Sequence, residues 1–411
     1  MARHISDKLK NIFTDTMWSI MGLFLMNIAA QFAVYPYWNR VLGTEAYGNI
    51  VYLLGIMNIM AISVGSGVNY TRMRQSAYGQ TTNKPYNILM TCGSVAALFV
   101  LLFFKVIGML NVSSLNFVLF SILTVITMWR YYADVEYRLH INYKGFFLYY
   151  LVIGIGYLFG IVLFRITGLW PMALLPGEIA GLALVVCRGL IFRRENWIVD
   201  NVKMDDVNQL LHISALLIGL NVLSQLLFNG DRIILRLSIG ETAVSIFYIS
   251  SLFGKAMTLV TTPLNGVLVG HLAKYEGKLT KKMMNQITVA TVAAVILVTM
   301  ACVFASVIIL PFLYPSEFET VKRYLILANA AQVIFFAGNV IITSIIFIFT
   351  PIKNQLVINI THGALFLAMC IPATIIYDIE GFCISLLIVN TLRFVLSLFL
   401  GYRNIGDEVR F

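Results

Sequence analysis

Apolar residues fall in long blocks along this 411-residue chain, separated by short polar connections. A helix of roughly 20 residues crosses a hydrocarbon core about 30 Å thick, and most of the blocks have this length. The pattern predicts twelve spans, with bounds at 12–35, 45–67, 87–108, 115–137, 146–166, 169–191, 209–229, 242–268, 286–312, 323–348, 355–376 and 381–402. We therefore expect an all-α polytopic membrane protein.

Composition and charge agree with this prediction. Hydrophobic residues make up 59% of the chain and charged residues only 12%, whereas soluble domains carry about 25% charged residues. Lysine and arginine concentrate in the connections on the side of the amino terminus, which predicts that both termini are cytoplasmic. The net charge of +10 then reflects this bias and contact with anionic membrane lipids, and it indicates no nucleic-acid partner.

Two short motifs recur in the same order in the two halves of the chain. "LMNIAAQF" in the first predicted span matches "GLNVLSQL" in the seventh, and "NRVLGTEAYGNIVY" (39–52) matches "LRLSIGETAVSIFY" (235–248). The matched pairs are Asn27 with Asn221, Gln31 with Gln225, Arg40 with Arg236, and Gly43 with Gly240.

Each half would hold six helices that start in the cytoplasm, as do the parallel repeats of one class of secondary transporters. We therefore expect two parallel six-helix lobes around a central cavity. The N-terminal lobe would comprise residues 1–191 and the C-terminal lobe residues 209–411, joined by a basic cytoplasmic linker at 192–208.

Polar residues form stripes at helical spacing on four of these spans. Such stripes face the bundle interior or a watery cavity, although hydrogen bonds between neighbouring helices explain a single stripe equally well. That spans one and seven carry equivalent stripes favours a shared cavity. The stripes are Asn27, Gln31 and Tyr35; Asn221, Gln225 and Asn229; Tyr248, Ser251, Lys255, Thr258 and Thr262; and Asn329, Gln332, Asn339 and Thr343.

The charged residues within the spans are mostly cationic. Lys255 and Arg393 each lie about midway along a predicted span, and Glu178 is the one acid at mid-depth. A cationic interior attracts anions, and phosphate suits it best because arginine binds phosphate in bidentate fashion. We expect Lys255 and Arg393, with Arg130, to bind an anionic headgroup. A buried pair of Lys255 or Arg393 with Glu178 or with a carbonyl group is the structural alternative.

Other charges have structural and functional interpretations that stay open. Arg130 has Asp134 four residues on, and Asp134 has Arg138, so a ladder of ion pairs is expected there. Glu178 follows Pro176-Gly177, which can break a helix, and burial would make it responsive to pH, so it is a candidate for ion coupling. At the outward rim, Arg40, Arg232 and Arg236 either bind the anion as it leaves or extend to the membrane interface.

No enzyme chemistry is indicated. The five cysteines lie in apolar spans without paired spacing, and the five histidines are scattered. We expect solvated or interfacial histidines, no metal site and no cofactor. There is no nucleophile–base pair and no phosphate-binding glycine loop in the sequence.

The segments "YPYWNRVLGTEAYGNIVY" and "NGDRIILRLSIGETAVSIFYISSLFGKAM" resemble Wzx-type lipid-linked oligosaccharide flippases. These form the polysaccharide-transporter branch of the multidrug/oligosaccharidyl-lipid/polysaccharide exporter superfamily. The second segment departs from the family's Gly-x-Tyr-Ser pattern at Ser245–Tyr248. The resemblance rests on Arg40, Leu42, Gly43, Tyr47, Gly48, Asp231, Ile233, Ile234, Leu235, Gly240, Phe247 and Tyr248.

The resemblance implies flipping of undecaprenyl-diphosphate-linked sugar repeat units, for O-antigen or a related surface polysaccharide, across a bacterial inner membrane. Its partners would be the polyprenyl-diphosphate-linked glycan, membrane lipids and other polysaccharide-assembly proteins. A multidrug exporter of the same superfamily is the first alternative, but export of organic cations needs acids in the cavity. A membrane glycan polymerase or ligase is the second, but it would need a substantial extracytoplasmic loop.

Overall fold

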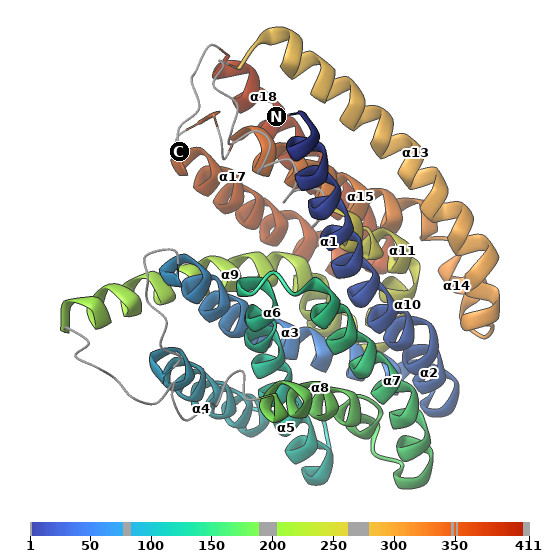
Figure 1. Cartoon of the computed structure of the whole chain (residues 1–411). Coiled ribbons are helices and arrows are strands. Elements are labelled where there is room, and N and C mark those ends of the chain that lie inside the picture. The colour runs from blue at the N-terminus through green and yellow to red at the C-terminus, as the bar shows by residue number, and fades with distance from the viewer. Residues whose placement is uncertain are drawn as a thin grey trace. The chain divides into compact units, whose positions relative to one another are not determined.

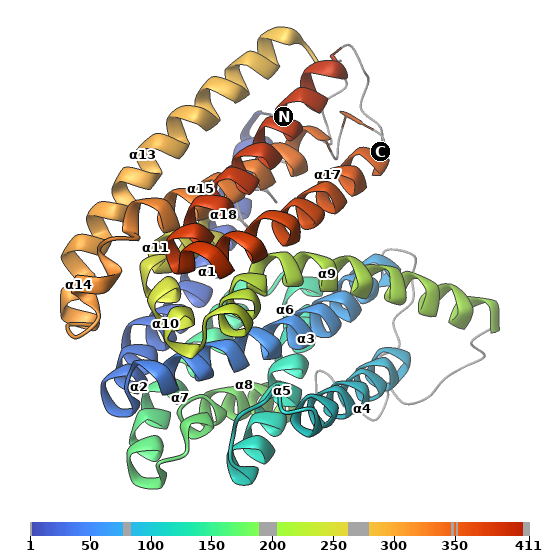
Figure 2. The same ribbon diagram turned by 180° about the vertical axis from the view of Figure 1, so that it is seen from behind.

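The structure, a computed structural model, describes residues 2–76, 84–188, 204–261, 279–346, 349–350 and 352–405. Within these ranges the chain is helical and contains no strand. Figure 1 shows the helices in chain order, and Figure 2 shows the same ribbon from behind.

Contacts divide the chain into two compact units, one of residues 1–41 and 52–231 and the other of residues 42–51 and 232–411. The boundary therefore differs from the expected linker. Residues 209–231, which the sequence assigns to the second lobe, group with the first unit, and the short segment 42–51 groups with the second. Residues 189–203, which include most of the expected linker, lie outside the described residues.

The first unit contains, in whole or in large part, α1 (Ala2–Ile28), the π-helix η1 (Ala29–Val34), α2 (Tyr35–Leu42), α3 (Thr44–Ser76), α4 (Lys84–Val106), α5 (Ser114–Ala133), α6 (Val135–Leu139), α7 (Tyr143–Thr167), the 3-10 helix η2 (Trp170–Ala173), α8 (Leu175–Cys187) and α9 (Met204–Ser238). Local sequence sets several of these ends. Ser113 and Asn142 accept hydrogen bonds from backbone N–H groups in the first turns of α5 and α7. Gly168, at φ +70°, ends α7.

The second unit contains the start of α3, the end of α9, and α10 (Glu241–Ser250), α11 (Leu252–Ala256), α13 (Lys281–Leu313), α14 (Phe318–Val321), α15 (Leu325–Ile341), the π-helix η4 (Ile342–Ile346), α17 (Ile352–Leu365), the π-helix η5 (Phe366–Cys370) and α18 (Ile371–Arg403). Helical geometry breaks inside α18 at Tyr377 and Asp378, where the chain turns back on itself. Gly381 permits this hairpin, because a Cβ there would lie 2.2 Å from the Ala373 carbonyl oxygen.

These helices account for the twelve predicted spans, so the all-α polytopic fold is confirmed. Eight helices among the described residues are long and apolar enough to cross a membrane, and one of them, Asn354–Arg403, contains the hairpin and supplies two spans. A bent pair, Glu241–Ser250 and Leu252–Thr261, supplies a further span. The shorter apolar helices α8 and α15 supply the remaining two.

Two spans differ from their expected form. The eighth, expected as one helix over 242–268, is bent by 63° between α10 and α11, and residues 262–268 lie outside the described ranges. The sixth is shorter than expected, because Pro176 lies in the first turn of α8 instead of breaking a longer helix. Glu178 therefore lies in the first turn of α8, just after the 3-10 helix η2.

The repeat seen in the sequence has a structural counterpart at two glycines. Gly43, between α2 and α3, has φ +84°, and Gly240, between α9 and α10, has φ +135°. Both angles favour glycine, which has no Cβ to strain the backbone. The two residues that the sequence pairs thus both lie between consecutive helices at a positive φ.

The matched motifs also contact each other within the second unit. A Cβ on Gly48 would lie 1.8 Å from the Glu241 carbonyl oxygen, so the start of α3 packs directly on α10. The Ser245 hydroxyl donates to the Thr44 carbonyl oxygen at 2.7 Å. Tyr47 adds a hydroxyl contact of 3.2 Å with Tyr314. These contacts explain why segment 42–51 groups with the second unit.

Candidate functional site

A buried ion pair joins α5 and α8 in the first unit. Arg130 Nε lies 2.8 Å from Glu178 Oε2, and the two side chains are only 5% and 3% exposed. The Tyr157 hydroxyl donates to the other carboxylate oxygen of Glu178 at 2.5 Å. The Tyr131 ring faces the guanidinium of Arg130 at 4.1 Å. The expected pair of Arg130 with Asp134 is therefore wrong, and Glu178 does not pair with Lys255 or Arg393. The other form of that alternative, a buried pair with a carbonyl, is observed for Arg393, which donates to the Phe335 carbonyl oxygen.

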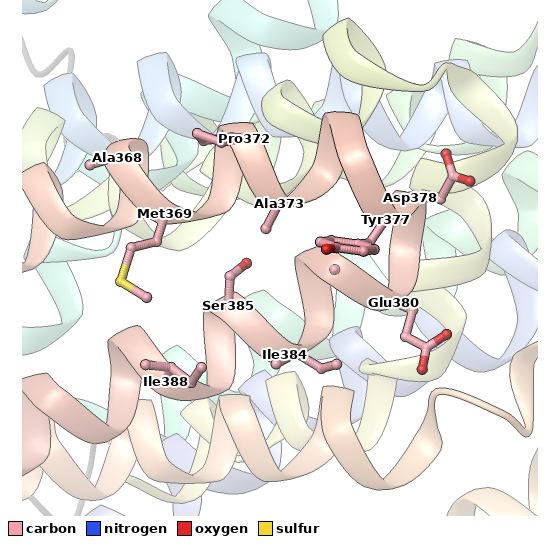
Figure 3. A pocket seen from close by; sticks show the side chains of 11 residues that line it. Ala368, Met369, Pro372, Ala373, Tyr377, Asp378, Glu380, Ile384, Ser385 and Ile388 are labelled. Atoms are coloured by element: carbon pink, nitrogen blue, oxygen red, sulfur yellow. The ribbon is translucent and has the colours of Figure 1, made fainter.

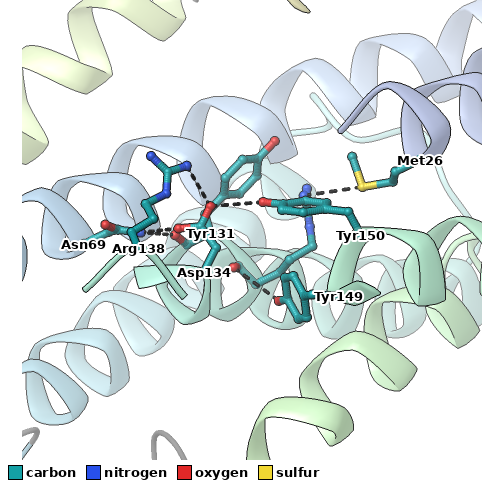
Figure 4. Close-up of polar contacts among 8 residues, drawn as sticks. Met26, Asn69, Tyr131, Asp134, Arg138, Tyr149 and Tyr150 are labelled. Atoms are coloured by element: carbon teal, nitrogen blue, oxygen red, sulfur yellow. Dashed lines mark hydrogen bonds and ion pairs between the residues drawn. The ribbon is translucent and has the colours of Figure 1, made fainter. Parts of the chain in front are cut away.

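Asp134 is the centre of a second buried network, shown in Figure 4. It accepts hydrogen bonds from Asn69 Nδ2 at 2.5 Å, Arg138 at 2.9 Å and the Tyr150 hydroxyl at 3.1 Å. The expected pair of Asp134 with Arg138 is thus confirmed. These contacts join α3, α6 and α7 to the junction of α5 and α6, so the carboxylate organises the first unit.

A third ion pair completes the pattern in the first unit. Arg72 lies 2.6 Å from Glu136 Oε1, with both side chains buried. Each buried arginine described in this unit, Arg72 and Arg130, therefore faces a glutamate. Since an isolated buried charge is strongly unfavourable, these pairs neutralise the interior of the unit.

Arg393, on α18 in the second unit, has a different environment. Its guanidinium donates to Asn339 Oδ1 at 2.6 Å and to the Phe335 carbonyl oxygen at 3.3 Å. It also faces the Phe335 ring at 4.5 Å. The side chain is buried, with 5% of the residue exposed, and its Nε has no hydrogen-bond partner. All its partners among the described residues are neutral, so its positive charge is not compensated there.

Arg232, at the end of α9, is like Arg393 a buried arginine with uncharged partners. It donates to the Val51 carbonyl oxygen at 3.3 Å, and its guanidinium lies 5.1 Å from the Tyr248 ring. It is 7% exposed, so a buried contact, and not extension to the membrane interface, holds its side chain. The second unit thus holds two buried guanidinium groups whose described partners carry no charge.

His362 lies beside Arg393, because both side chains face the Phe335 ring. Its Nε2 is 3.0 Å from Asn390 Oδ1, and Asn390 Nδ2 donates to the Ala331 carbonyl oxygen at 2.8 Å. His362 is buried and its Nδ1 has no partner. The expected solvated or interfacial role for this histidine is therefore wrong. The spacing of residues in the sequence could not reveal the burial of His362, because its partners lie on other helices.

Lys255 is buried on α11, with Nζ 6.0 Å from the centre of the Phe247 ring. The bend that precedes α11 is held by Asn329 of α15. Asn329 Nδ2 donates to the Ser250 carbonyl oxygen at 2.9 Å, and its Oδ1 accepts from the Gly254 N–H at 2.7 Å. The bend leaves backbone groups without helical partners, and Asn329 satisfies two of them.

The stripe of the tenth span therefore serves two structural purposes, since Asn329 holds the bend and Asn339 holds Arg393. The stripes of spans one and seven are different. Their amides bond within their own helices, Asn27 to the Leu23 carbonyl oxygen at 2.8 Å and Asn221 to the Leu217 carbonyl oxygen at 2.9 Å. Thr262 and the side chain of Thr343 lie outside the described residues.

The glutamines of the repeat also bond within their helices. Gln31 donates to Asn27 Oδ1 at 3.4 Å, and Gln225 accepts from Asn229 Nδ2 at 3.1 Å. None of the four matched Asn and Gln residues bonds to another helix in the described part of the chain, so hydrogen bonding between helices is not their role there. All four residues are half-buried.

The remaining rim arginines lie at helix ends. Arg236 forms an ion pair with Glu241 at 2.9 Å, and Arg40 is exposed in the last turn of α2. Among the described residues, no group of three or more His, Cys, Asp or Glu side chains could hold a metal ion.

Comparison with known proteins finds similarity in structure. No family model and no curated protein sequence matches the chain. The MATE transporter VcmN of Vibrio cholerae has a TM-score of 0.60 at 15% identity, with 97% of each chain covered. A MATE transporter in complex with MaD5 has a TM-score of 0.64 at 15% identity, with 96% of this chain and 95% of that chain covered.

A transporter of the MOP superfamily from Pyrococcus furiosus has a TM-score of 0.61 at 12% identity, with 96% of this chain and 95% of that chain covered. Its binding pocket has reversed polarity, which suggests a different function for that protein. This chain therefore has the two-lobed fold of the MATE transporters, which belong to the MOP superfamily.

Proposed function

We propose that this chain is a membrane transporter that moves an anionic, lipid-linked solute. Specifically, it flips undecaprenyl-diphosphate-linked oligosaccharide repeat units from the cytoplasmic to the periplasmic leaflet by alternating access. The fold of MATE transporters supports the general activity, and the resemblance to Wzx-type flippases supports the specific solute.

The observation that carries the proposal is the electrostatic difference between the two units. The buried arginines of the first unit face glutamates, whereas Arg232 and Arg393 face carbonyl groups, an amide and aromatic rings. An anion that reaches these two guanidinium groups gains charge-assisted hydrogen bonds without displacing a protein carboxylate. A diphosphate suits them, because a guanidinium fork matches two phosphate oxygens.

The residues divide by role in this proposal. Arg393, Arg232 and Lys255 bind the diphosphate, and the half-buried amides of Asn27, Gln31, Asn221 and Gln225 bind sugar hydroxyls. We assign Arg130 a structural role. To bind a solute it would have to leave Glu178, and breaking this buried ion pair costs roughly 3–5 kcal/mol.

Export of small molecules is the second candidate, and the fold favours it, since similar structures include multidrug resistance transporters of the MATE family. The charges of the candidate site argue against organic cations as the solutes. A cation needs an uncompensated acid. Of the five buried acids among the described residues, Asp134, Glu136 and Glu178 are paired with arginine. Glu317 accepts hydrogen bonds from the hydroxyls of Thr44 and Ser316, and Asp231 is the fifth.

The test is complementation of a strain that lacks its own repeat-unit flippase. Surface polysaccharide and membrane abundance are measured for wild type and for Arg393→Ala, Arg393→Lys, Lys255→Ala and Lys255→Arg. Arg165→Ala is the matched control, because Arg165 is exposed in the last turn of α7. We expect Arg393→Ala and Lys255→Ala to abolish export at normal abundance, Lys255→Arg to retain it, and the control to export normally.

Arg393→Lys separates charge from geometry, because lysine keeps the charge but loses the planar fork. We expect it to export partly. Normal export by Arg393→Ala and Lys255→Ala would exclude the proposed diphosphate site. Failure of wild-type complementation, combined with resistance to drugs in the same strain, would favour the small-molecule exporter.

A further inference from the structure

The buried imidazole of His362 has one ring nitrogen that its surroundings leave unused. Asn390 Nδ2 donates to the Ala331 carbonyl oxygen at 2.8 Å, which fixes the orientation of the Asn390 amide. Asn390 Oδ1 therefore accepts from His362 Nε2 at 3.0 Å, so Nε2 carries the hydrogen of the neutral ring. The other nitrogen, Nδ1, has no hydrogen-bond partner among the described residues. It presents a buried lone pair that can accept a proton.

This imidazole belongs to the same cluster as the guanidinium of Arg393. Asn390 and Arg393 are one turn apart on α18. Their acceptors, the carbonyl oxygens of Ala331 and Phe335, are likewise one turn apart on α15. The Phe335 ring is 5.8 Å from the imidazole ring and 4.5 Å from the guanidinium. Two basic side chains thus share one buried cluster, and the proposed transport uses only the guanidinium.

No acid in the described part of the chain compensates this cluster. α17, which carries His362, packs against α18, η4 and η5, and the shared aromatic ring belongs to α15. The sequences of α15, α17, η4 and η5 contain no Asp or Glu. α18 contains two acids, Asp378 and Glu380, which lie at the turn of the last hairpin (Figure 3). Arg393 is thirteen positions beyond Glu380, the nearer acid, which is about 20 Å along the helix.

A proton on His362 would therefore add a second positive charge to the cluster. The buried titratable groups of the neighbouring η5 and α18, Cys370 and Cys383, are thiols and stay neutral at neutral pH. They offer no charge that balances an imidazolium. Because two uncompensated buried cations are strongly unfavourable, the imidazole stays neutral until an anion enters.

Helical geometry is interrupted on both sides of the cluster. The π-helix η5 begins at Phe366, whose ring stacks on His362 with the ring centroids 6.4 Å apart. The π-helix η4 begins at Ile342, three residues after Asn339, which accepts from Arg393. π-helical segments are rare and frequently occur at functional sites. These interruptions therefore support a functional role for both basic side chains.

We propose that His362 takes up one proton together with the diphosphate and releases it when the diphosphate leaves, a role that rests on the proposed function. A proton from water binds to Nδ1, and the new N–H donates to one phosphate oxygen while Arg393 binds another. The two negative charges of the diphosphate compensate both cations at once. Each solute then moves with one proton, so transport responds to pH.

Calorimetry on the purified full-length protein tests this coupling. The ligand is a farnesyl diphosphate ester of N-acetylglucosamine, whose esterified phosphates have no second ionisation near neutral pH. Binding is measured in Tris and in HEPES, because the difference in heat between two buffers of different ionisation enthalpy gives the number of protons taken up. We expect wild type to take up about one proton per ligand, so that its affinity rises up to about tenfold for each unit by which the pH falls.

His362→Gln separates the proton from the hydrogen bond. Its amide can still donate to Asn390 Oδ1, but it cannot take up a proton. This variant should bind the ligand more weakly, with proton uptake close to zero and little dependence on pH. His212→Gln is the matched control, because His212 is an exposed histidine on α9, and it should behave as wild type does.

Spectra of wild type labelled with ¹⁵N-histidine give a second test that needs no variant. One of the five histidine signals should change from the neutral to the imidazolium form when the ligand is added. Binding without proton uptake and without this change would overturn the role of His362 and leave the proposed function intact. Equal proton uptake by a folded His362→Gln protein would do the same. Failure of wild type to bind the ligand would overturn the proposed function and the role of His362 with it.

Discussion

The pair of Arg130 with Glu178 makes a sharp prediction about stability. Glu178→Gln keeps the size of the side chain and an oxygen that can accept from Tyr157, but it removes the charge 2.8 Å from Arg130 Nε. The other contacts of the guanidinium, with the Met26 sulfur at 3.7 Å and with the Tyr131 and Tyr150 rings, are neutral. Because both partners are almost fully buried, loss of one leaves an uncompensated charge and costs roughly 3–5 kcal/mol.

The assay is thermal unfolding of the full-length protein in detergent, with membrane abundance measured in parallel. Glu178→Gln should lower the apparent Tm by on the order of 10 °C. The double variant Arg130→Met/Glu178→Leu should recover most of that loss, because well-packed apolar residues can replace a buried ion pair. If Glu178 instead carries a coupling proton, the Gln variant would mimic its protonated form and keep the wild-type Tm, but transport would no longer respond to the proton gradient. That result would refute the structural assignment.

Two further predictions concern packing. Asn329→Ala should lower the free energy of unfolding by about 2–4 kcal/mol, because the Gly254 N–H and the Ser250 carbonyl oxygen lose the partner that holds the bend. Thermal unfolding measures this loss of stability. An unchanged Tm would contradict the role of Asn329 in holding the bend. Gly48→Ala should sharply reduce membrane abundance, because the Cβ of the new alanine would lie 1.8 Å from the Glu241 carbonyl oxygen. Gly219→Ala is the control, because a Cβ there meets open space, and this variant should accumulate normally.

The sequence was sufficient for the spans because the membrane itself sets helix length. Even the hairpin between the last two spans was expected, since polar residues interrupt the apolar pattern around Asp378 and Glu380. The bend between α10 and α11 was not expected from the sequence. It depends on Asn329 from a distant helix, and a local pattern of apolar residues carries no information about such a partner.

The prediction of the candidate site was limited in the same way, because local patterns do not show which distant helices become neighbours. Helical spacing suggests partners three or four residues away, so it identified Asp134 with Arg138 correctly and assigned Arg130 to the wrong acid. His362 and Arg393 were separate in the sequence and meet only because both face Phe335. Burial of single residues within apolar spans was predictable, whereas compensation of their charges depends on which helices become neighbours.

Asn339 offers a direct test of whether the uncompensated charge of Arg393 serves transport. Its Oδ1 already accepts from Arg393 at 2.6 Å, so Asn339→Asp would place a carboxylate against the guanidinium with almost no change in shape. The second unit would then resemble the first, where each buried arginine faces an acid. We expect the apparent Tm to stay at or above that of wild type, since the buried charge gains a partner. Export of surface polysaccharide should fall strongly, because an anionic solute must now compete with the new carboxylate. Asn339→Ala is the control for loss of the amide alone and should lower the Tm instead. Normal export by a stable Asn339→Asp protein would show that the charge of Arg393 is structural, and the diphosphate would then have to bind elsewhere.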